Sequence, residues 1–157
     1  MSLLFDAIRH NKLDSIQQLV TANESLVNTV DERGSTPLLL ASYYGHLEVV
    51  QFLLSFNPSV DAVDAMGNTA LLGVSFKGYT EIASLLIAKG ANVNHQNKAG
   101  ATALIYAIRF NQPEMIKILM EQGADPSIAD NEGNSAKTYA LQQGIDLDEF
   151  RIISSGT

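Results

Sequence analysis

The side chains best suited to acid–base or metal chemistry are the histidines and the acids. The 157-residue chain has three histidines, His10, His46 and His95, and no cysteine. Imidazole and carboxylate groups act as general acids and bases and bind zinc. No HExxH, GxxxxGK[ST] or GxSxG motif occurs, nor a GxGxxG after a strand. We therefore expect no catalytic centre, no metal site and no cofactor.

The positions of the histidines favour structural roles. His46 directly follows Gly45, so a hydrogen bond to nearby backbone is expected there. His10 falls at the end of an expected helix and His95 in a loop, and both are expected to be exposed. Many of the acids recur at a fixed spacing, which indicates that they shape turns and helix starts rather than form a catalytic pair: Asp31, Asp64 and Asp130, with Glu48, Glu81 and Glu114.

The elements that position these residues follow a repeat of 33 residues, since Gly34, Gly67, Gly100 and Gly133 are spaced at that interval. Thr36, Thr69 and Thr102 keep the same phase, with Ser135 next, and Leu38, Leu71 and Leu104 follow. We expect one domain over residues 1–157. Its three full units are 31–63, 64–96 and 97–130, flanked by degenerate end units at 3–30 and 131–153 and by a frayed tail at 154–157.

Each unit is predicted to form two short helices and a turn. In the first full unit, Thr36 is a good N-cap and Pro37 suits the first helical position. The first helix should run to Tyr44, and Gly45 should end it in the left-handed conformation. The second helix should begin near Leu47. Asparagine replaces glycine at several of the terminators, and asparagine tolerates positive φ best after glycine, so we expect left-handed backbone at Asn11, Asn23, Asn57 and Asn111 as well.

Helices this short cannot bury an apolar face alone, so neighbouring units must stack. The end units should present polar outer faces. Lys137 replaces the in-phase leucines in the last unit, and polar residues such as Lys12 and Gln18 recur in the first. We expect residues 145–153 to close the stack as a short helix with Leu147, Phe150 and Ile153 pointing inward.

These units resemble the ankyrin repeat, with GSTPLLLASYYGHLEVVQFLL and GANVN as the closest matches. The resemblance covers about residues 3–153. It implies an all-α fold, an ankyrin-repeat solenoid of helix–turn–helix units with projecting β-hairpin loops, made of three full repeats plus N- and C-terminal capping repeats. The signature histidine is replaced by Leu39, Leu72 and Ile105, so apolar packing should substitute for its polar network.

Composition narrows the possible partners. The net charge of −7 and a pI of about 4.8 disfavour nucleic acid and anionic membrane. The first twenty residues lack the basic leader of a signal peptide, and no apolar run approaches the length of a membrane span. We therefore expect a cytoplasmic protein. Both ends of the stack look capped, which predicts a monomer.

The resemblance implies that a partner protein binds at the hairpin tips and at the ends of the first helices. These positions do not follow the repeat pattern, so recognition can be encoded there. They combine aromatic and basic side chains with one acid, which favours a partner segment with acidic and apolar residues. The predicted site comprises Arg9, His10, Glu32, Arg33, Ser35, Tyr43, Tyr44, Met66, Asn68, Phe76, Lys77, Lys98, Arg109 and Phe110, with Ala65, Ala99 and Ala101 also at the tips.

Four functions are compatible with this pattern. The favoured one is a non-catalytic protein-interaction scaffold, which the resemblance implies. The alternatives are a regulatory or protective accessory subunit of an enzyme, an inhibitory module that occupies another protein's active site, and direct catalysis. Catalysis would need converging titratable groups, which the sequence does not indicate.

Overall fold

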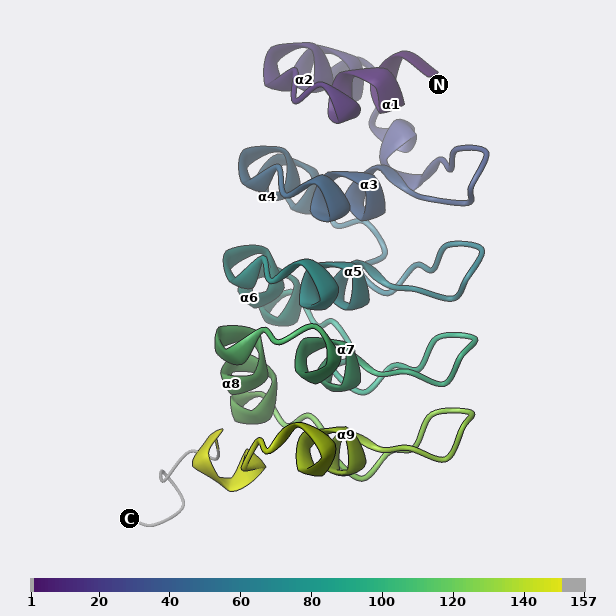
Figure 1. The fold of residues 1–157 in the computed structure, drawn as a ribbon. Helices are drawn as coiled ribbons and strands as arrows, with labels where there is room; N and C mark the ends of the chain where they lie inside the picture. The colour runs from purple at the N-terminus through teal and green to yellow at the C-terminus, as the bar shows by residue number, and fades with distance from the viewer. Residues whose placement is uncertain (1, 151–157) are drawn as a thin grey trace.

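The computed structural model describes residues 2–150 as a stack of short helix pairs in two rows (Figure 1). The inner row lies beside the projecting loops and consists of α1 (Ser2–Arg9), α3 (Pro37–Tyr44), α5 (Ala70–Lys77), α7 (Ala103–Arg109) and α9 (Ala136–Gln143). The outer row consists of α2 (Leu13–Ala22), α4 (Leu47–Leu54), α6 (Thr80–Ala88) and α8 (Pro113–Glu121), and two 3₁₀ helices follow α2 and α9, η1 (Glu24–Asn28) and η2 (Leu147–Phe150).

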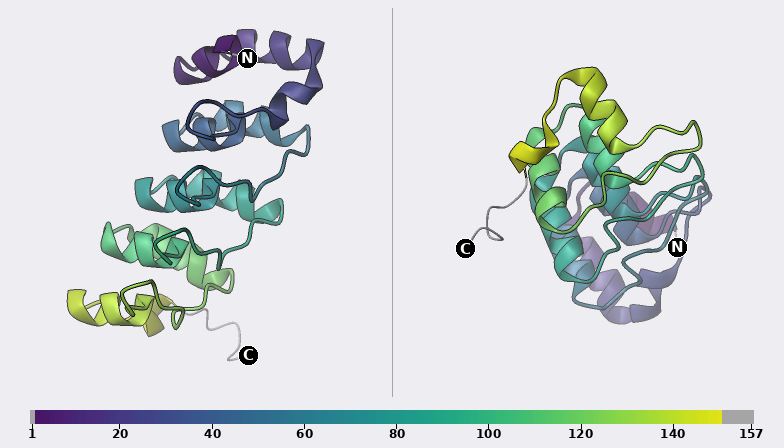
Figure 2. Two further views of the ribbon diagram at one scale, coloured as in Figure 1. Left: turned by 90° about the vertical axis from the view of Figure 1, so that its right-hand side faces the viewer. Right: turned by 90° about the horizontal axis from the view of Figure 1, so that it is seen from below.

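The stack is elongated, and each helix pair packs mainly on the pair before it and the pair after it (Figure 2). The expected all-α solenoid is therefore confirmed. No helix among residues 2–150 is both long enough and apolar enough to cross a membrane.

The inner helices begin as their sequences predict. The hydroxyls of Thr36, Thr69 and Thr102 each accept a hydrogen bond from the amide three residues ahead, at 3.1, 3.3 and 3.2 Å. Ser135 caps α9 in the same way, at 3.3 Å. Each cap satisfies one of the free amides in the first turn of its helix, so the positions of these Thr and Ser residues determine where α3, α5, α7 and α9 begin.

The helix terminators confirm the glycine–asparagine prediction except at one position. Asn11, Asn57 and Asn111 have φ of 54°, 52° and 56°, in the same region as the terminal glycines. The prediction for Asn23 is wrong: its φ is −151°, and its side chain instead caps η1 by accepting from the amide of Ser25 at 3.2 Å. The first unit continues into a 3₁₀ turn at this point, so no left-handed residue is needed.

The core is aliphatic and continuous between the rows. Leu38, Leu71 and Leu104 are each at most 1% exposed. The residues that replace the signature histidine, Leu39, Leu72 and Ile105, are also buried, so apolar packing occupies that position as expected.

The end face of the last unit is mixed: Lys137 is exposed where the other units bury leucine, and Leu141 on the same face of α9 is 82% exposed. The closing helix is shorter than predicted and is a 3₁₀ turn, η2, which buries Leu147 and half-buries Phe150. The expected position of Ile153 and the predicted tail at 154–157 lie outside the described residues.

The four loops between units share one hydrogen-bonding arrangement. Each opens with Asp or Asn, whose Oδ1 accepts from the amides two and four residues ahead at 2.9–3.0 Å. This confirms that the recurring loop acids shape turns. Within residues 2–150 the β pairing is limited to one isolated bridge, between Ala129 and Ser135, so the expected β-hairpins are turns without strands. The Asp and Asn residues that open the four loops and accept these hydrogen bonds are Asp31, Asp64, Asn97 and Asp130.

Consecutive loop tips are joined through their backbones. The amides of Ala65, Lys98 and Asn131 donate to a carbonyl of the preceding tip at 3.3, 3.1 and 3.0 Å. Glycine at each tip has positive φ and leaves room for this approach: a Cβ at Gly100 would lie 2.8 Å from the Asn131 amide nitrogen, whereas Gly133, which has no following loop, would meet nothing within 4 Å.

We predict that Gly100→Ala destabilises the fold more than Gly133→Ala does. Both changes place alanine in left-handed backbone, at a cost of about 1–2 kcal/mol. Gly100→Ala also crowds the next loop and should cost at least about 1 kcal/mol more. Urea unfolding of the two variants measures the difference, and equal unfolding midpoints would contradict the packing role of the tip glycine.

Candidate functional site

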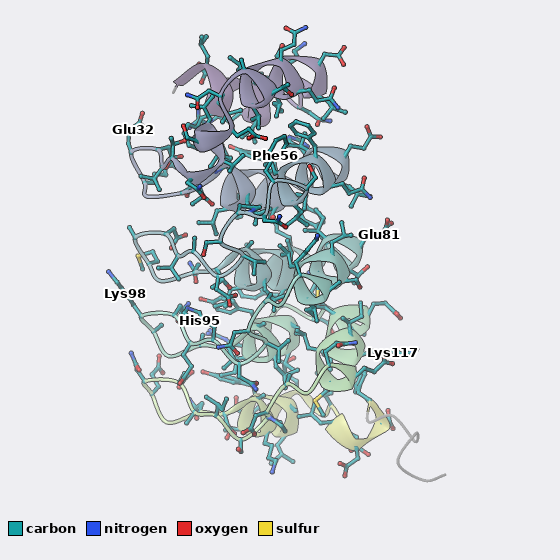
Figure 3. The ribbon with its side chains drawn as sticks, turned by 180° about the vertical axis from the view of Figure 1, so that it is seen from behind. Glu32, Phe56, Glu81, His95, Lys98 and Lys117 are labelled. Atoms are coloured by element: carbon teal, nitrogen blue, oxygen red, sulfur yellow. The ribbon has the colours of Figure 1, made fainter. Side chains whose placement is uncertain are left out.

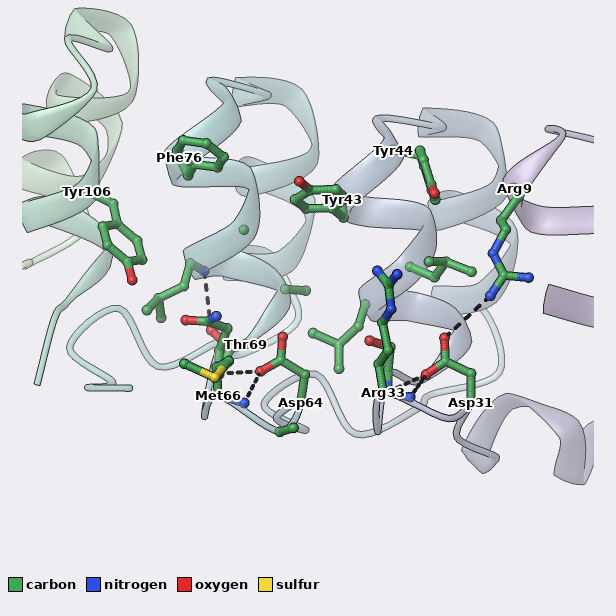
Figure 4. Close-up of a pocket in the computed structure, with 18 of the residues that line it drawn as sticks. Arg9, Asp31, Arg33, Tyr43, Tyr44, Asp64, Met66, Thr69, Phe76 and Tyr106 are labelled. Carbon is green, nitrogen blue, oxygen red and sulfur yellow. Dashed lines mark hydrogen bonds and ion pairs between the residues drawn. The ribbon is translucent and has the colours of Figure 1, made fainter. Parts of the chain in front are cut away.

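A groove of about 960 Å³ runs between the inner helices and the loops (Figure 4). Loop residues of the first two full units form one wall, and the exposed sides of α3 and α5 form the other. We call this the central groove. Its lining residues are Arg9, Asp31, Glu32, Arg33, Ser35, Leu39, Leu40, Tyr43, Tyr44, Asp64, Ala65, Met66, Asn68, Thr69, Ala70, Leu72, Gly73, Phe76, Tyr106 and Phe110.

Most of the predicted partner-binding residues line this groove, but some do not. Lys77 and Lys98 lie outside it, as do His10 and Arg109. Lys98 lies at a loop tip and points away from the stack (Figure 3). Ala101, which is expected at a tip, is buried. The structure brings together Arg9, Glu32, Arg33, Ser35, Tyr43, Tyr44, Met66, Asn68, Phe76 and Phe110.

Large exposed apolar side chains concentrate in the groove. Tyr43, Tyr44, Met66 and Phe110 are 45%, 43%, 63% and 45% exposed, and all four line it. Clustered apolar side chains of this kind are a feature of interaction surfaces, whereas single exposed ones are not. The other large exposed apolar residues lie elsewhere in the described chain: Leu3, Val30, Val63 and Leu141.

The groove aromatics also contact one another. The rings of Phe76 and Phe110 meet edge to face with centroids 4.4 Å apart, which joins α5 to the end of α7. Tyr43 and Tyr44 form a second edge-to-face pair at 5.9 Å, and the Lys77 ammonium lies 4.8 Å from the Tyr43 ring centre. These contacts place the rings in defined orientations before any partner binds.

The charge of the groove differs from the sequence-based expectation. A basic groove is expected, but Asp31 and Asp64 line it together with Glu32. Arg9 pairs with Asp6 at 3.0 Å and approaches Asp31 at 3.7 Å, where the Asp31 side chain is only 5% exposed. The groove is therefore of mixed charge, because the loop-opening acids turn one carboxylate oxygen toward the helices.

Gly73 and Tyr106 also line the groove and are not among the residues predicted from the sequence. Together with Leu40 and Tyr139 they occupy one position of the repeat, spaced by 33 residues, and this position varies strongly in size. Such variation marks a non-repeating position and could have identified them. Glycine within a helix costs about 1 kcal/mol relative to alanine, so Gly73 is unfavourable for α5 itself.

Tyrosines at this position anchor the loops. Tyr139 donates its hydroxyl proton to Oδ2 of Asp130 at 2.5 Å, and the Tyr106 hydroxyl accepts from the side-chain Nδ2 of Asn97 at 2.7 Å. Burial alone would raise the pKa of Asp130, but the hydrogen bonds from Tyr139 and from the amides of Asn134 and Glu132 lower this pKa below its ordinary value. The same bond to Asp130 raises the pKa of Tyr139.

Two of the histidines contact backbone carbonyls, and the third stacks on a tyrosine. His10 is exposed as expected, and its Nδ1 lies 2.9 Å from the Asp6 carbonyl. His95 is half-buried rather than exposed, with Nε2 2.9 Å from the carbonyl of Gly67. His46 stacks on Tyr44 at 5.8 Å, and its Nε2 is buried without a hydrogen-bond partner in the described part of the chain, so the expected backbone bond is not formed by this atom. Residues 2–150 contain no group of three or more metal-ligating side chains.

Stacked helix pairs with loops along one edge and an open groove beside them define a helical-repeat protein of the solenoid class.

The chain belongs to the ankyrin repeat family: the family model described as ankyrin repeats (3 copies) matches residues 4–97 and 72–150. Among curated proteins, DNA-binding protein RFXANK of Homo sapiens is 44% identical over 45 residues, 29% of this chain and 17% of that protein. Ankyrin repeat domain-containing protein 49 of Bos taurus is 41% identical over 58 residues, which are 37% of this chain and 24% of that protein. Protein fem-1 homolog C of Danio rerio is 42% identical over 55 residues, which are 32% of this chain and 9% of that protein. The matched segment spans less than a quarter of each of these relatives.

We predict that the Phe76–Phe110 pair contributes to stability as well as to the groove surface. A double-mutant cycle with Phe76→Ala, Phe110→Ala and the double variant should give a coupling free energy of about 0.5–1.5 kcal/mol in urea unfolding. Additive effects would show that the two rings are independent surface residues.

We predict that Tyr139→Phe raises the pKa of Asp130, because the variant loses the donor that favours the carboxylate. A depressed folded-state pKa contributes stability above the ordinary pKa of aspartate, and this contribution is lost as pH falls through the folded-state value. Wild type should therefore exceed Tyr139→Phe in stability by more at pH 7 than in acid. Carboxyl-detected NMR titration measures the pKa, and an unchanged value would contradict the role of the hydroxyl.

Proposed function

We propose that this chain is a non-catalytic scaffold that binds another protein through the central groove. Ankyrin repeats generally mediate protein–protein interaction, and the family is typically non-catalytic. The observation that carries the proposal is the gathering of Tyr43, Tyr44, Met66 and Phe110 in one groove, each more than 40% exposed. Tyrosine is enriched among the residues that dominate binding energy, and methionine adapts to irregular apolar surfaces.

The partner segment should carry apolar side chains along the groove and acidic groups near its basic rim. Arg33 lines the groove and is exposed, while Lys77 and Lys98 lie just outside it. Because Asp31, Glu32 and Asp64 also line the groove, a uniformly acidic partner would be repelled. The acidic contacts are therefore expected at the rim, with apolar contacts in the centre.

A protein partner fits the charge of the chain better than nucleic acid does. RFXANK is named a DNA-binding protein, but the net charge of −7 on the present chain disfavours phosphate backbones.

We also propose that the chain is a monomer, because the exposed Lys137 places a charge on the end face of the last unit.

The groove is tested by Tyr44→Ala combined with Met66→Ala. Tyr44 and Met66 are 43% and 63% exposed, so their removal should reduce partner capture at least tenfold while shifting the melting temperature by only about 3 °C or less. The measurement is affinity capture from the source cells on immobilised protein, read by mass spectrometry, with thermal unfolding in parallel.

The matched control is Gln51→Ala combined with Lys117→Ala, two exposed residues on the outer helices α4 and α8 that do not line the groove. Figure 3 shows Lys117 on the side away from the loops. This control should capture the same proteins as wild type. Equal capture by the groove variant would show that binding occurs elsewhere, and a loss of ten degrees or more in melting temperature would show that the two side chains are structural.

A further inference from the structure

The inner-helix position held by Leu40, Gly73, Tyr106 and Tyr139 differs between units in whether its side chain fills the space between helix and loop. In the third full unit and in the last unit, Tyr106 and Tyr139 extend from this position to the loop-opening side chain nine residues earlier, at 2.7 and 2.5 Å. In the second full unit the position is Gly73, and the residue nine positions earlier is Asp64. Both Gly73 and Asp64 line the central groove.

Asp64 has an oxygen available to the groove. Its Oδ1 accepts from the amides of Met66 and Asn68 at 2.9 and 3.0 Å, as in every loop. Its Oδ2 corresponds to the Asp130 oxygen that binds Tyr139, and within residues 2–150 this atom makes no intramolecular hydrogen bond or ion pair. Figure 4 shows the Asp64 carboxylate on the loop side of the groove, across from Tyr43 on α3.

The backbone does not require glycine at position 73, because this residue does not have a positive φ and lies inside α5. A Cβ built there would meet only Tyr43, with Cδ1 at 3.9 Å, an ordinary van der Waals distance. Glycine also weakens a helix relative to alanine. Gly73 therefore leaves a notch beside the Tyr43 ring where the next two units place a phenol.

We propose that the notch over Gly73 binds a tyrosine side chain of the partner protein, whose hydroxyl donates a hydrogen bond to Oδ2 of Asp64. The inference rests on the proposed function and names the side chain that the groove recognises. The ring would occupy the space that Tyr106 and Tyr139 occupy in their own units and would pack against Tyr43. The geometry of the Tyr139–Asp130 pair is the template for this contact.

Tyrosine fits this notch better than the other candidate side chains do. Phenylalanine would leave the Asp64 oxygen without a donor, and burying an unpaired carboxylate oxygen is unfavourable. Phosphotyrosine would bring a dianion against Asp64. Lysine would pair with the carboxylate but would not reproduce the ring packing on Tyr43. The notch should therefore discriminate among these side chains.

The first test uses N-acetyl-L-tyrosine amide as a probe, with chemical shifts of ¹⁵N-labelled full-length chain as the readout. Saturable shifts are expected at the amides of Gly73, Met66 and Asn68, with a dissociation constant on the order of 1 mM for so small a ligand. The phenylalanine and lysine amides should bind at least about fivefold more weakly, and the phosphotyrosine amide should give no shifts at these residues.

The second test fills the notch from within. Gly73→Tyr should raise the melting temperature by about 2–4 °C and abolish probe binding, because the chain then supplies its own phenol. The matched control, Gly73→Ala, should also raise the melting temperature through helix propensity but should keep most of the probe binding, since a methyl group leaves the notch open.

Three results would overturn the inference: no shifts at Gly73 with the tyrosine amide, equal or tighter binding of the lysine or phenylalanine amide, or probe binding that persists in a folded Gly73→Tyr variant. The probe measurements on wild type do not depend on whether Gly73→Tyr folds. If they fail while Tyr44→Ala with Met66→Ala still loses its partner, the scaffold function stands and only the tyrosine notch is wrong.

Discussion

The structure depends on one arrangement of hydrogen bonds, in which a loop-opening Asp or Asn accepts two amides of its own loop through Oδ1. The arrangement gives each loop the same shape. Tips of the same shape can then meet at a constant spacing, where glycine lets the next backbone approach and one amide joins each pair of tips. The loops thus form a regular wall opposite the inner helices, and the groove lies between the two walls.

The same loop-opening side chain has a second polar atom, which is free to make a further contact beyond its own loop. In the last two units a tyrosine binds this atom, and in the first full unit Arg9 approaches it at 3.7 Å. In the second full unit Gly73 leaves it open to the groove. Asp64 shapes its loop as the other loop-opening residues do, and it can also face a partner because the residue nine positions later, Gly73, is a glycine.

The aromatic residues of the groove have a comparable double role. Phe76 and Phe110 join neighbouring units through their ring contact, while Tyr43 and Tyr44 remain nearly half exposed. Pre-oriented rings lose little conformational freedom when a partner binds, which favours affinity. The matched segments cover less than a quarter of the relatives, whereas the recognition that we propose depends on positions that vary between units.

Features that depend on local contacts could be predicted from the sequence. The caps at Thr36 and its equivalents depend on hydrogen bonds that span three residues, and the left-handed asparagines depend on the local backbone of a helix end, so residue type determines both. The 33-residue units follow directly from the spacing of the repeated residues. Asn23 is the exception, because its unit continues into a 3₁₀ turn. The charge of the groove and the notch over Gly73 were decided only by the tertiary structure. Both features depend on where the second carboxylate oxygen of a loop-opening acid points: toward the helix of its own unit or toward a helix of the neighbouring unit. The folding of each loop against its helix and the stacking of the units bring these oxygens and the helix side chains together.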